Sequence, residues 1–133
     1  TGFRGAAFDR LHPALRPEVM TFEGAVRQLA SAVDRVLRKH GRNIIGKQFA
    51  SRRLADTMID LFVLASVMSR VSTSLQGNAP NADKEHEILR IFSRQAIGRV
   101  NLHFAAIDDN DDELVKSVAD HALQAGRFSW DNL

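Results

Sequence analysis

The stretch from Gln48 to Leu75 constrains the fold of this chain more than any other feature. It contains no proline or glycine, so it reads as one long helix. Its first half is amphipathic, whereas the segment from Leu61 to Met68 is apolar on every side except at Ser66. A helix that is hydrophobic all round must be buried by other helices or by a partner. The sequence therefore predicts a long helix that its surroundings cover.

Apolar residues at helical spacing predict four helices in all. The first runs from about Thr21, which can cap it, to His40, and Gly41 ends it. The second runs from about residue 43 to 76, the third from Asn81 or Asp83 to about 106, and the fourth from about 110 to the residue before Gly126. No strand pattern is visible in the sequence and the connections are short. These features favour an all-α fold, an antiparallel bundle of four main helices with an irregular N-terminal segment.

Each predicted helix has an apolar stripe that we expect to face the core. The first stripe comprises Phe22, Val26, Leu29, Val33, Val36, Leu37 and His40. The second comprises Ser51, Leu54, Ala55, Met58, Phe62, Ala65, Ser69 and Ser72, the third Ile88, Leu89, Phe92, Ala96, Val100 and Ile107, and the fourth Leu114, Val115, Val118, Ala122 and Leu123. Arg99 and His103 lie beside the third stripe, so their polar ends need partners or water.

The predicted organisation has three parts. Residues 1–20 contain two glycines and two prolines and show no sustained period, which indicates a linker or strapping segment, although Phe3, Phe8, Leu11 and Leu15 can still pack. Residues 21–126 form the helical bundle domain. Residues 127–133 form a C-terminal tail with two aromatic residues, which we expect to dock. The chain opens with Thr-Gly, which indicates a piece of a longer protein or a processed chain.

Charge is distributed unevenly along the chain although the net charge is only +2. Seven basic residues lie between Arg35 and Arg53 with no acidic residue among them, and five acidic residues lie between Asp108 and Glu113. Such asymmetry indicates an anionic partner or a self-complementary contact. The basic run has three interpretations: a solvated helix face, contact with anionic lipid head groups, or, ranked last because no aromatic platform accompanies it, nucleic acid. No run reaches the roughly 20 apolar residues of a membrane span.

The sequence offers almost no catalytic chemistry. There is no cysteine, no HExxH pair and no Glu-x-x-His motif, and the acidic run lacks the glycine and the final glutamate of an EF-hand loop. Phosphate-cradling and dinucleotide-binding glycine loops and a GxSxG nucleophile motif are missing from the sequence as well. We therefore expect no catalytic, cofactor-binding or metal-binding residue in this segment.

The long helix also carries a family resemblance. The segments Gln48-Phe49, Arg53-Leu54-Ala55-Asp56, Ile59-Asp60-Leu61, Ser69-Arg70, Ser72 and Ser74-Leu75, with His12-Pro13, Lys39-His40 and Glu85-His86-Glu87 as flanks, resemble the C-terminal helical domain of the very-long-chain acyl-CoA dehydrogenase family, which includes a sibling that assists respiratory complex I assembly. The likeness covers about residues 10–105 and fades in the acidic turn, the last helix and the tail. These segments are packing patterns. Lys47 departs from the family, which often has an acidic residue there.

The resemblance implies a parent enzyme that oxidises long-chain acyl-CoA thioesters at Cα–Cβ with FAD and passes electrons to an electron-transfer flavoprotein. The family's catalytic glutamate and flavin contacts belong to a preceding catalytic domain, so none is carried onto this sequence. The resemblance also implies that this domain packs on its own catalytic domain, supports a homo-oligomer and attaches to a membrane. The location would be the matrix side of the mitochondrial inner membrane in a eukaryote, or the cytoplasmic membrane face in a bacterium.

Two groups of residues are candidates for these roles. We expect six apolar residues of the long helix to act in packing or at an interface: Phe49, Leu54, Met58, Phe62, Val63 and Val67. We expect six basic residues to form the anionic-surface contact: Arg38, Lys39, Arg42, Lys47, Arg52 and Arg53. The alternative function is a non-catalytic helical scaffold for protein assembly, motivated by the excess apolar surface of the long helix. A nucleic-acid-binding bundle is a weaker alternative.

Overall fold

A computed structural model describes residues 10–44 and 47–126 of the chain and confirms an all-α fold with four main helices. The elements are a 3₁₀ helix η1 (Pro13–Leu15), α2 (Arg16–His40), a 3₁₀ helix η2 (Gly41–Ile44), α3 (Gln48–Gln76), α4 (Ala82–Asp108) and α5 (Asp112–Ala125). No strand occurs in the described residues.

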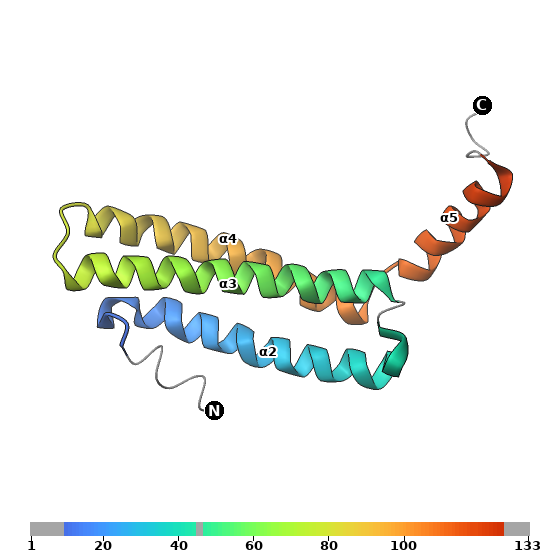
Figure 1. The fold of residues 1–133 in the computed structure, drawn as a ribbon, viewed down its shortest axis with the longest axis horizontal. Coiled ribbons are helices and arrows are strands. Elements are labelled where there is room, and N and C mark those ends of the chain that lie inside the picture. The colour runs from blue at the N-terminus through green and yellow to red at the C-terminus, as the bar shows by residue number, and fades with distance from the viewer. Residues whose placement is uncertain (1–9, 45–46, 127–133) are drawn as a thin grey trace.

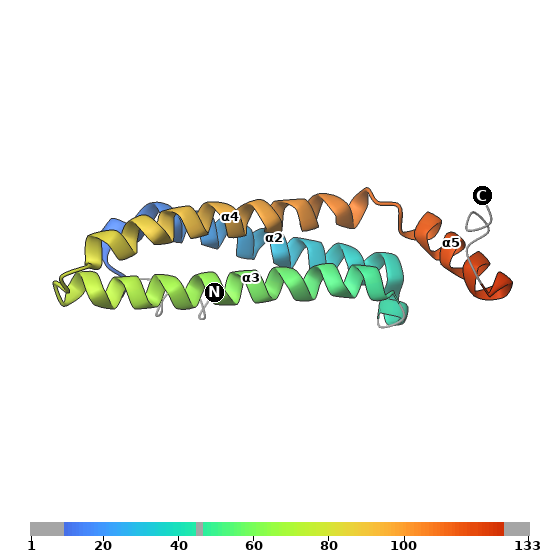
Figure 2. The same ribbon diagram turned by 90° about the horizontal axis from the view of Figure 1, so that it is seen from above.

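Helices α2, α3 and α4 run up, down and up along one long bundle, and α5 leaves its end (Figures 1 and 2). Contacts link each of the three bundle helices to the other two, and they are most numerous between α3 and α4. No residue of α5 is buried. The antiparallel arrangement is thus present, but three helices build the core and the fourth projects from it.

Two predicted helix starts differ from the structure. Helix α2 begins at Arg16, well before Thr21, because Pro17 occupies the first turn, where its missing N–H is not needed. Helix α3 begins at Gln48, later than the predicted residue 43. Gly41 has a φ of 57°, a left-handed conformation that glycine adopts without strain, and the chain then makes the turn η2 before α3 starts.

The core consists of two apolar clusters that share Leu29 and Phe104 at their edges. The larger cluster is centred on Leu61, Leu64 and Met68 of α3 and on Leu89 and Val100 of α4, with Leu15 sealing one end. The smaller cluster joins α2, the start of α3 and Ile107 near the end of α4. The buried face of α3 comprises Ala50, Leu54, Thr57, Leu61, Leu64, Met68, Val71 and Ser72.

The predicted stripe of α3 was therefore wrong in its orientation. Leu54 and Ser72 are buried, but Ala55, Met58, Phe62 and Ser69 are exposed. Because α3 has apolar residues around its whole circumference, helical spacing does not single out one face. The neighbours α2 and α4 cover the face that carries Leu61, Leu64 and Met68.

The stripes of α2 and α4 were correct only in part. Phe22 and Val36 on α2 and Leu89, Ala96, Val100 and Ile107 on α4 are buried, whereas Val26, Leu37 and Ile88 are exposed. The buried positions that the sequence pattern missed are mostly small, namely Ala25 and Ala32 on α2 and Ser93 on α4. Small side chains let helix backbones approach closely, and a stripe drawn through large residues overlooks them.

The apolar stripe of α5 does not enter the core. Leu114, Val115, Val118 and Leu123 are half to four-fifths exposed. The chain turns at Asp109, which has extended φ and ψ angles, so that α5 points away from the bundle (Figure 1). The apolar stripe of α5 is therefore not covered by any other part of the chain that the structure describes.

The described part of the N-terminal segment is tied to the far end of α3. The backbone N–H of His12 donates to Ser72 Oγ at 2.8 Å, and Gln76 Nε2 donates to the carbonyl oxygen of Arg10 at 2.8 Å. Leu15 is fully buried and Leu11 packs against the larger cluster. Phe3, Phe8 and the tail 127–133 lie outside the described residues, so the predictions for them are not tested.

Helix α3 is also long and apolar enough to span a membrane by length and composition alone. No uninterrupted run of about 20 apolar residues occurs in α3, but its mean hydropathy is high because few charged residues interrupt the apolar ones. Its packing against α2 and α4 is that of a bundle helix, in which Leu64 and Met68 are fully buried.

Candidate functional site

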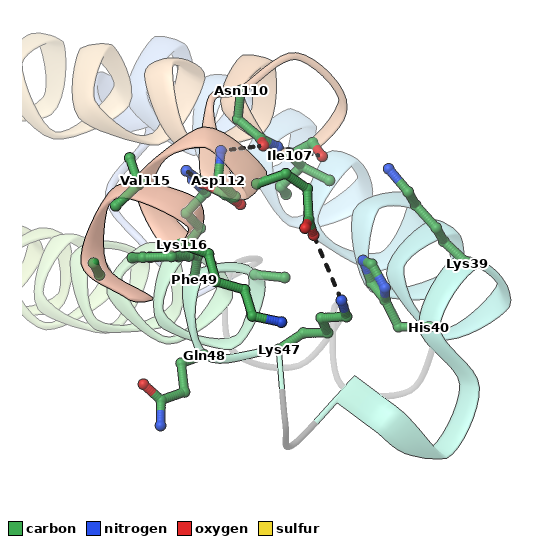
Figure 3. A pocket seen from close by; sticks show the side chains of 14 residues that line it. Lys39, His40, Lys47, Gln48, Phe49, Ile107, Asn110, Asp112, Val115 and Lys116 are labelled. Atoms are coloured by element: carbon green, nitrogen blue, oxygen red, sulfur yellow. Dashed lines mark hydrogen bonds and ion pairs between the residues drawn. The ribbon is translucent and has the colours of Figure 1, made fainter. Parts of the chain in front are cut away.

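A groove opens where four helix ends meet, and it is the candidate functional site. Its volume is about 450 Å³. The end of α2 provides Lys39 and His40, and the end of α4 provides Ile107. The start of α5 provides the opposite wall (Figure 3). Lys47 and the start of α3 provide the remaining side, with Gln48, Phe49, Ala50 and Arg53. The groove is amphipathic, since charged side chains and apolar ones both line it.

The strongest polar contact in the groove joins Arg53 of α3 to Asp112 of α5. The two guanidinium nitrogens donate to the two carboxylate oxygens at 2.6 Å each, and both side chains are at least three-quarters covered. These hydrogen bonds lower the pKa of Asp112 and raise the pKa of Arg53. The positive charge of Lys39 contributes to the lowering of the Asp112 pKa. The pair fixes the base of α5 to the bundle.

The acidic run and the basic run, which are far apart in the sequence, meet at this place. Lys47 Nζ lies 3.7 Å from Glu113 Oε1, and Arg35 Nη2 lies 3.3 Å from Asp108 Oδ2. The charge asymmetry of the sequence is therefore partly a self-complementary contact within the chain. Carboxylates of α5 and of the end of α4 thus lie beside part of the basic run, and its contact with an anionic surface stays a prediction.

The six predicted anionic-surface residues consequently have different environments. Lys47 and Arg53 pair with α5, while Arg38 and Arg52 pair with Asp34 and Asp56 one turn earlier or later on their own helices. Lys39 is exposed and lines the groove, and no ion pair is formed by it among the described residues. The side chain of Arg42 lies outside the described part of the structure.

The six predicted packing residues also differ in how far they are buried. Leu54 is buried in the smaller cluster, and Val67 packs against the larger one. Phe49 lines the groove and is 41% exposed. Met58, Phe62 and Val63 are exposed on the bundle surface, and Phe62 is 73% exposed. The predicted stripe wrongly placed Met58 and Phe62 on the core face. The role of Met58, Phe62 and Val63 at an interface stays a prediction.

The sequence reasoning did not single out the α5 side of the groove. Asp112, Glu113, Val115, Lys116 and Ala119 all line it. The sequence contained one signal for this wall, the acidic run Asp108–Glu113, whose charge complements the basic run. The sequence did not indicate that these residues face Lys47 and Arg53, because the direction of α5 depends on the turn at Asp109 that follows α4.

A second polar contact clamps the middle of the bundle. Arg99 of α4 donates through Nη2 to Asp60 Oδ1 of α3 at 2.9 Å and through Nε at 3.2 Å. This bond raises the pKa of Arg99. The predicted need of Arg99 for a partner is thereby met.

The described residues do not assemble a metal site. No group of three His, Cys, Asp or Glu side chains in them lies close enough to hold an ion. Residues 10–44 and 47–126 also contain no glycine-rich loop of the kind that binds a dinucleotide. His86 Nε2 of α4 lies 3.7 Å from Oε1 of the buried Glu18 of α2, and these two side chains are not part of a group of three possible ligands in the described residues.

Comparison with known proteins shows the family to which the chain belongs. The family model described as the ACAD9/ACADV C-terminal domain matches residues 13–128, which includes α5. The very-long-chain specific acyl-CoA dehydrogenase of Bos taurus, a mitochondrial protein, is 35% identical over 107 residues, or 77% of this chain. The corresponding proteins of Homo sapiens and Macaca fascicularis are 33% identical over 75% and 32% identical over 92% of the chain.

The chain spans only 15–19% of the length of these relatives. The likeness reaches further towards the C-terminus than the sequence motifs indicated, because the family match continues through the acidic turn and the last helix. The chain belongs to the family of ACAD9/ACADV C-terminal domains.

Proposed function

We propose that this chain is the C-terminal domain of an FAD-dependent long-chain acyl-CoA dehydrogenase of fatty acid β-oxidation, and that it packs on the catalytic domain and supports a homo-oligomer. The family match over residues 13–128 supports the assignment to such a parent. The relatives are acyl-CoA dehydrogenases by name. FAD and the reaction belong to the catalytic domain, so no chemical step is assigned to a residue of this chain.

The exposed apolar surface of α3 carries the packing part of this proposal. Ile59 and Phe62 are 60% and 73% exposed, and Met58 and Val63 lie beside them at helical spacing. Leu37 on α2 and Leu102 on α4 are also exposed. Contiguous exposed apolar surface marks an interface. A catalytic domain in the same polypeptide is the partner that the family membership provides.

Membrane attachment is the third part of the proposal. The exposed Lys39 and the neighbouring Arg38 lie at the end of α2, where each basic residue near an anionic surface adds about 1 kcal/mol of attraction. The relatives are mitochondrial proteins by name. We therefore place the parent on the matrix side of the mitochondrial inner membrane in a eukaryote, or on the cytoplasmic membrane face in a bacterium.

The intact native protein gives the first test. Isolation with an antibody against this chain should yield a polypeptide whose mass is several times the 14.8 kDa of this chain. It should show oxidised-flavin absorption bands and dehydrogenase activity on long-chain acyl-CoA. A flavin-free protein that co-purifies with assembly partners would favour the alternative, a non-catalytic scaffold. Both functions use the exposed apolar surface of α3, so flavin and activity are the readouts that separate them.

A substitution tests the packing role directly in the long protein. Phe62→Asp should weaken the contact with the catalytic domain and lower the melting temperature of the holoenzyme, because it places a charge in an apolar interface. Met20→Asp is the matched control, since Met20 is a similarly exposed apolar residue on α2. Equal, small effects of the two substitutions would contradict the proposed interface.

A further inference from the structure

We propose that the groove between the ends of α2, α3, α4 and α5 binds an amphipathic anion, a small molecule with one negatively charged head group on an apolar chain. The inference comes from two features that coincide in one cavity: an excess of positive charge over negative charge in its lining, and apolar side chains that the described part of the chain leaves exposed. It does not depend on the acyl-CoA dehydrogenase parent.

The charge balance of the groove is positive. Lys39, Lys47, Arg53 and Lys116 face the two carboxylates of Asp112 and Glu113, so two positive charges remain. Arg53 is saturated by Asp112, and Lys47 lies near Glu113. Among the described residues, Lys39 on one wall and Lys116 on the other form no ion pair with a carboxylate. An anionic head group between these two ammonium groups would compensate one of the two charges if it is a carboxylate and up to both if it is a phosphate monoester.

Besides the charged residues and the polar His40, Gln48 and Asn110, the groove is lined by apolar side chains. Ile107 and Ala50, 7% and 9% exposed, form part of the smaller core cluster and reach the floor of the groove. Phe49 and Val115 flank it and are 41% and 50% exposed. Figure 3 shows Ile107 and Val115 on the side of the groove opposite Lys39 and His40. An inorganic anion would leave the exposed side chains of Phe49 and Val115 in water, whereas an alkyl chain attached to the head group would cover them.

The size of the cavity agrees with this class of ligand. A volume of about 450 Å³ lies within the range of roughly 300–1,000 Å³ that is usual for small-molecule sites. Such sites are mostly apolar with a few placed polar groups. Fatty-acid carboxylates and the phosphate head groups of single-chain lipids share the required chemistry.

The test is an NMR titration of the ¹⁵N-labelled 133-residue chain with four probes. Laurate and dodecyl phosphate carry the same chain with a carboxylate or a phosphate, dodecyl maltoside carries the chain without charge, and inorganic phosphate carries charge without the chain. We expect saturable shifts of the backbone amides in segments 48–53 and 115–119 with at least one of the two anionic amphiphiles. The preferred one identifies the head group. The maltoside and inorganic phosphate should bind at least about tenfold more weakly.

Charge reversal locates the head group. Lys39→Glu with Lys116→Glu should weaken binding by about tenfold or more. The matched control is Arg70→Glu with Arg94→Glu, which changes the net charge equally at exposed positions away from the groove and should leave the affinity unchanged.

Three results would overturn the proposal. Equal affinity for the maltoside would reveal a merely apolar surface, and equal affinity for inorganic phosphate would reveal a simple anion site. Shifts centred on the exposed residues 58–63 of α3, with the groove unaffected, would show that the amphiphile covers the bundle surface instead.

Discussion

Asp112 accepts two hydrogen bonds from Arg53, a residue that lies 59 positions earlier in the chain. This contact, with the neighbouring pair of Lys47 and Glu113, is what holds the base of α5. A bidentate, partly covered pair of this kind contributes more than an exposed one, for which about 0–1 kcal/mol is usual. At the scale of single residues, the orientation of α5 depends on a few charged side chains.

Replacing Asp112 by Asn should loosen α5 at neutral pH, because the carboxylate that accepts from Arg53 is lost. Arg53 lowers the pKa of Asp112, so the contact is fully present above the ordinary value of 3.8 and is lost as the pH falls through the lowered pKa. The wild type and Asp112→Asn should therefore differ at pH 7 and converge in acid. ¹⁵N relaxation of the α5 amides measures this, with Asp111→Asn, an exposed neighbour, as the control.

Leu64 and Phe62 lie two residues apart on α3, but truncation of their side chains should change the stability by very different amounts. Leu64 is fully buried in the larger cluster, so Leu64→Ala should cost about 2–5 kcal/mol of unfolding free energy. Phe62 is 73% exposed, so Phe62→Ala should change it by less than about 0.5 kcal/mol. Urea unfolding of the two variants of the 133-residue chain measures the difference. Similar costs would mean that another part of the chain covers Phe62.

At the scale of elements, α5 differs from the other three helices. It is amphipathic and ends at Gly126, which has a φ of 72° in a left-handed cap, so its own sequence specifies a complete helix. Yet none of its residues is buried, and its exposed apolar face includes Leu114 and Leu123. Both core clusters are built without it.

Removal of α5, by ending the chain after Asp109, should therefore leave a folded three-helix bundle. We expect a cooperative thermal transition by circular dichroism with a stability loss of about 1–3 kcal/mol, which corresponds to the lost contacts of Arg53 and Lys47. A truncated chain that melts without cooperativity would show that α5 packs into the core.

At the scale of the whole molecule, the surface combines an apolar side with a basic end. Met58, Ile59, Phe62 and Val63 are exposed along α3. Arg38 and Lys39 lie at the end of α2, and the acidic run compensates part of the charge beside them. The bundle is thus equipped for contacts with larger partners in two separate regions.

Membrane attachment can be tested by flotation with anionic vesicles. Reversal of Arg38, Lys39 and Arg42 to Glu should reduce binding by at least about tenfold, since three basic residues near the surface contribute about 1 kcal/mol each. The matched control reverses Arg70, Arg90 and Arg94, exposed residues outside this region. Binding should also fall with increasing salt. Unchanged binding of the first variant would refute the electrostatic contact.

The all-α class, the four helices and the family were evident from the sequence, because helical spacing, glycine stops and local motifs are properties of neighbouring residues. Gln76 and Ala125 end their helices as the glycines that follow them indicate. The face of α3 that is buried was decided by tertiary structure, since an all-round apolar helix has no preferred side until α2 and α4 cover it. The groove likewise required the fold: Asp112 reaches Arg53 only because the chain turns at Asp109, and no local pattern encodes that meeting.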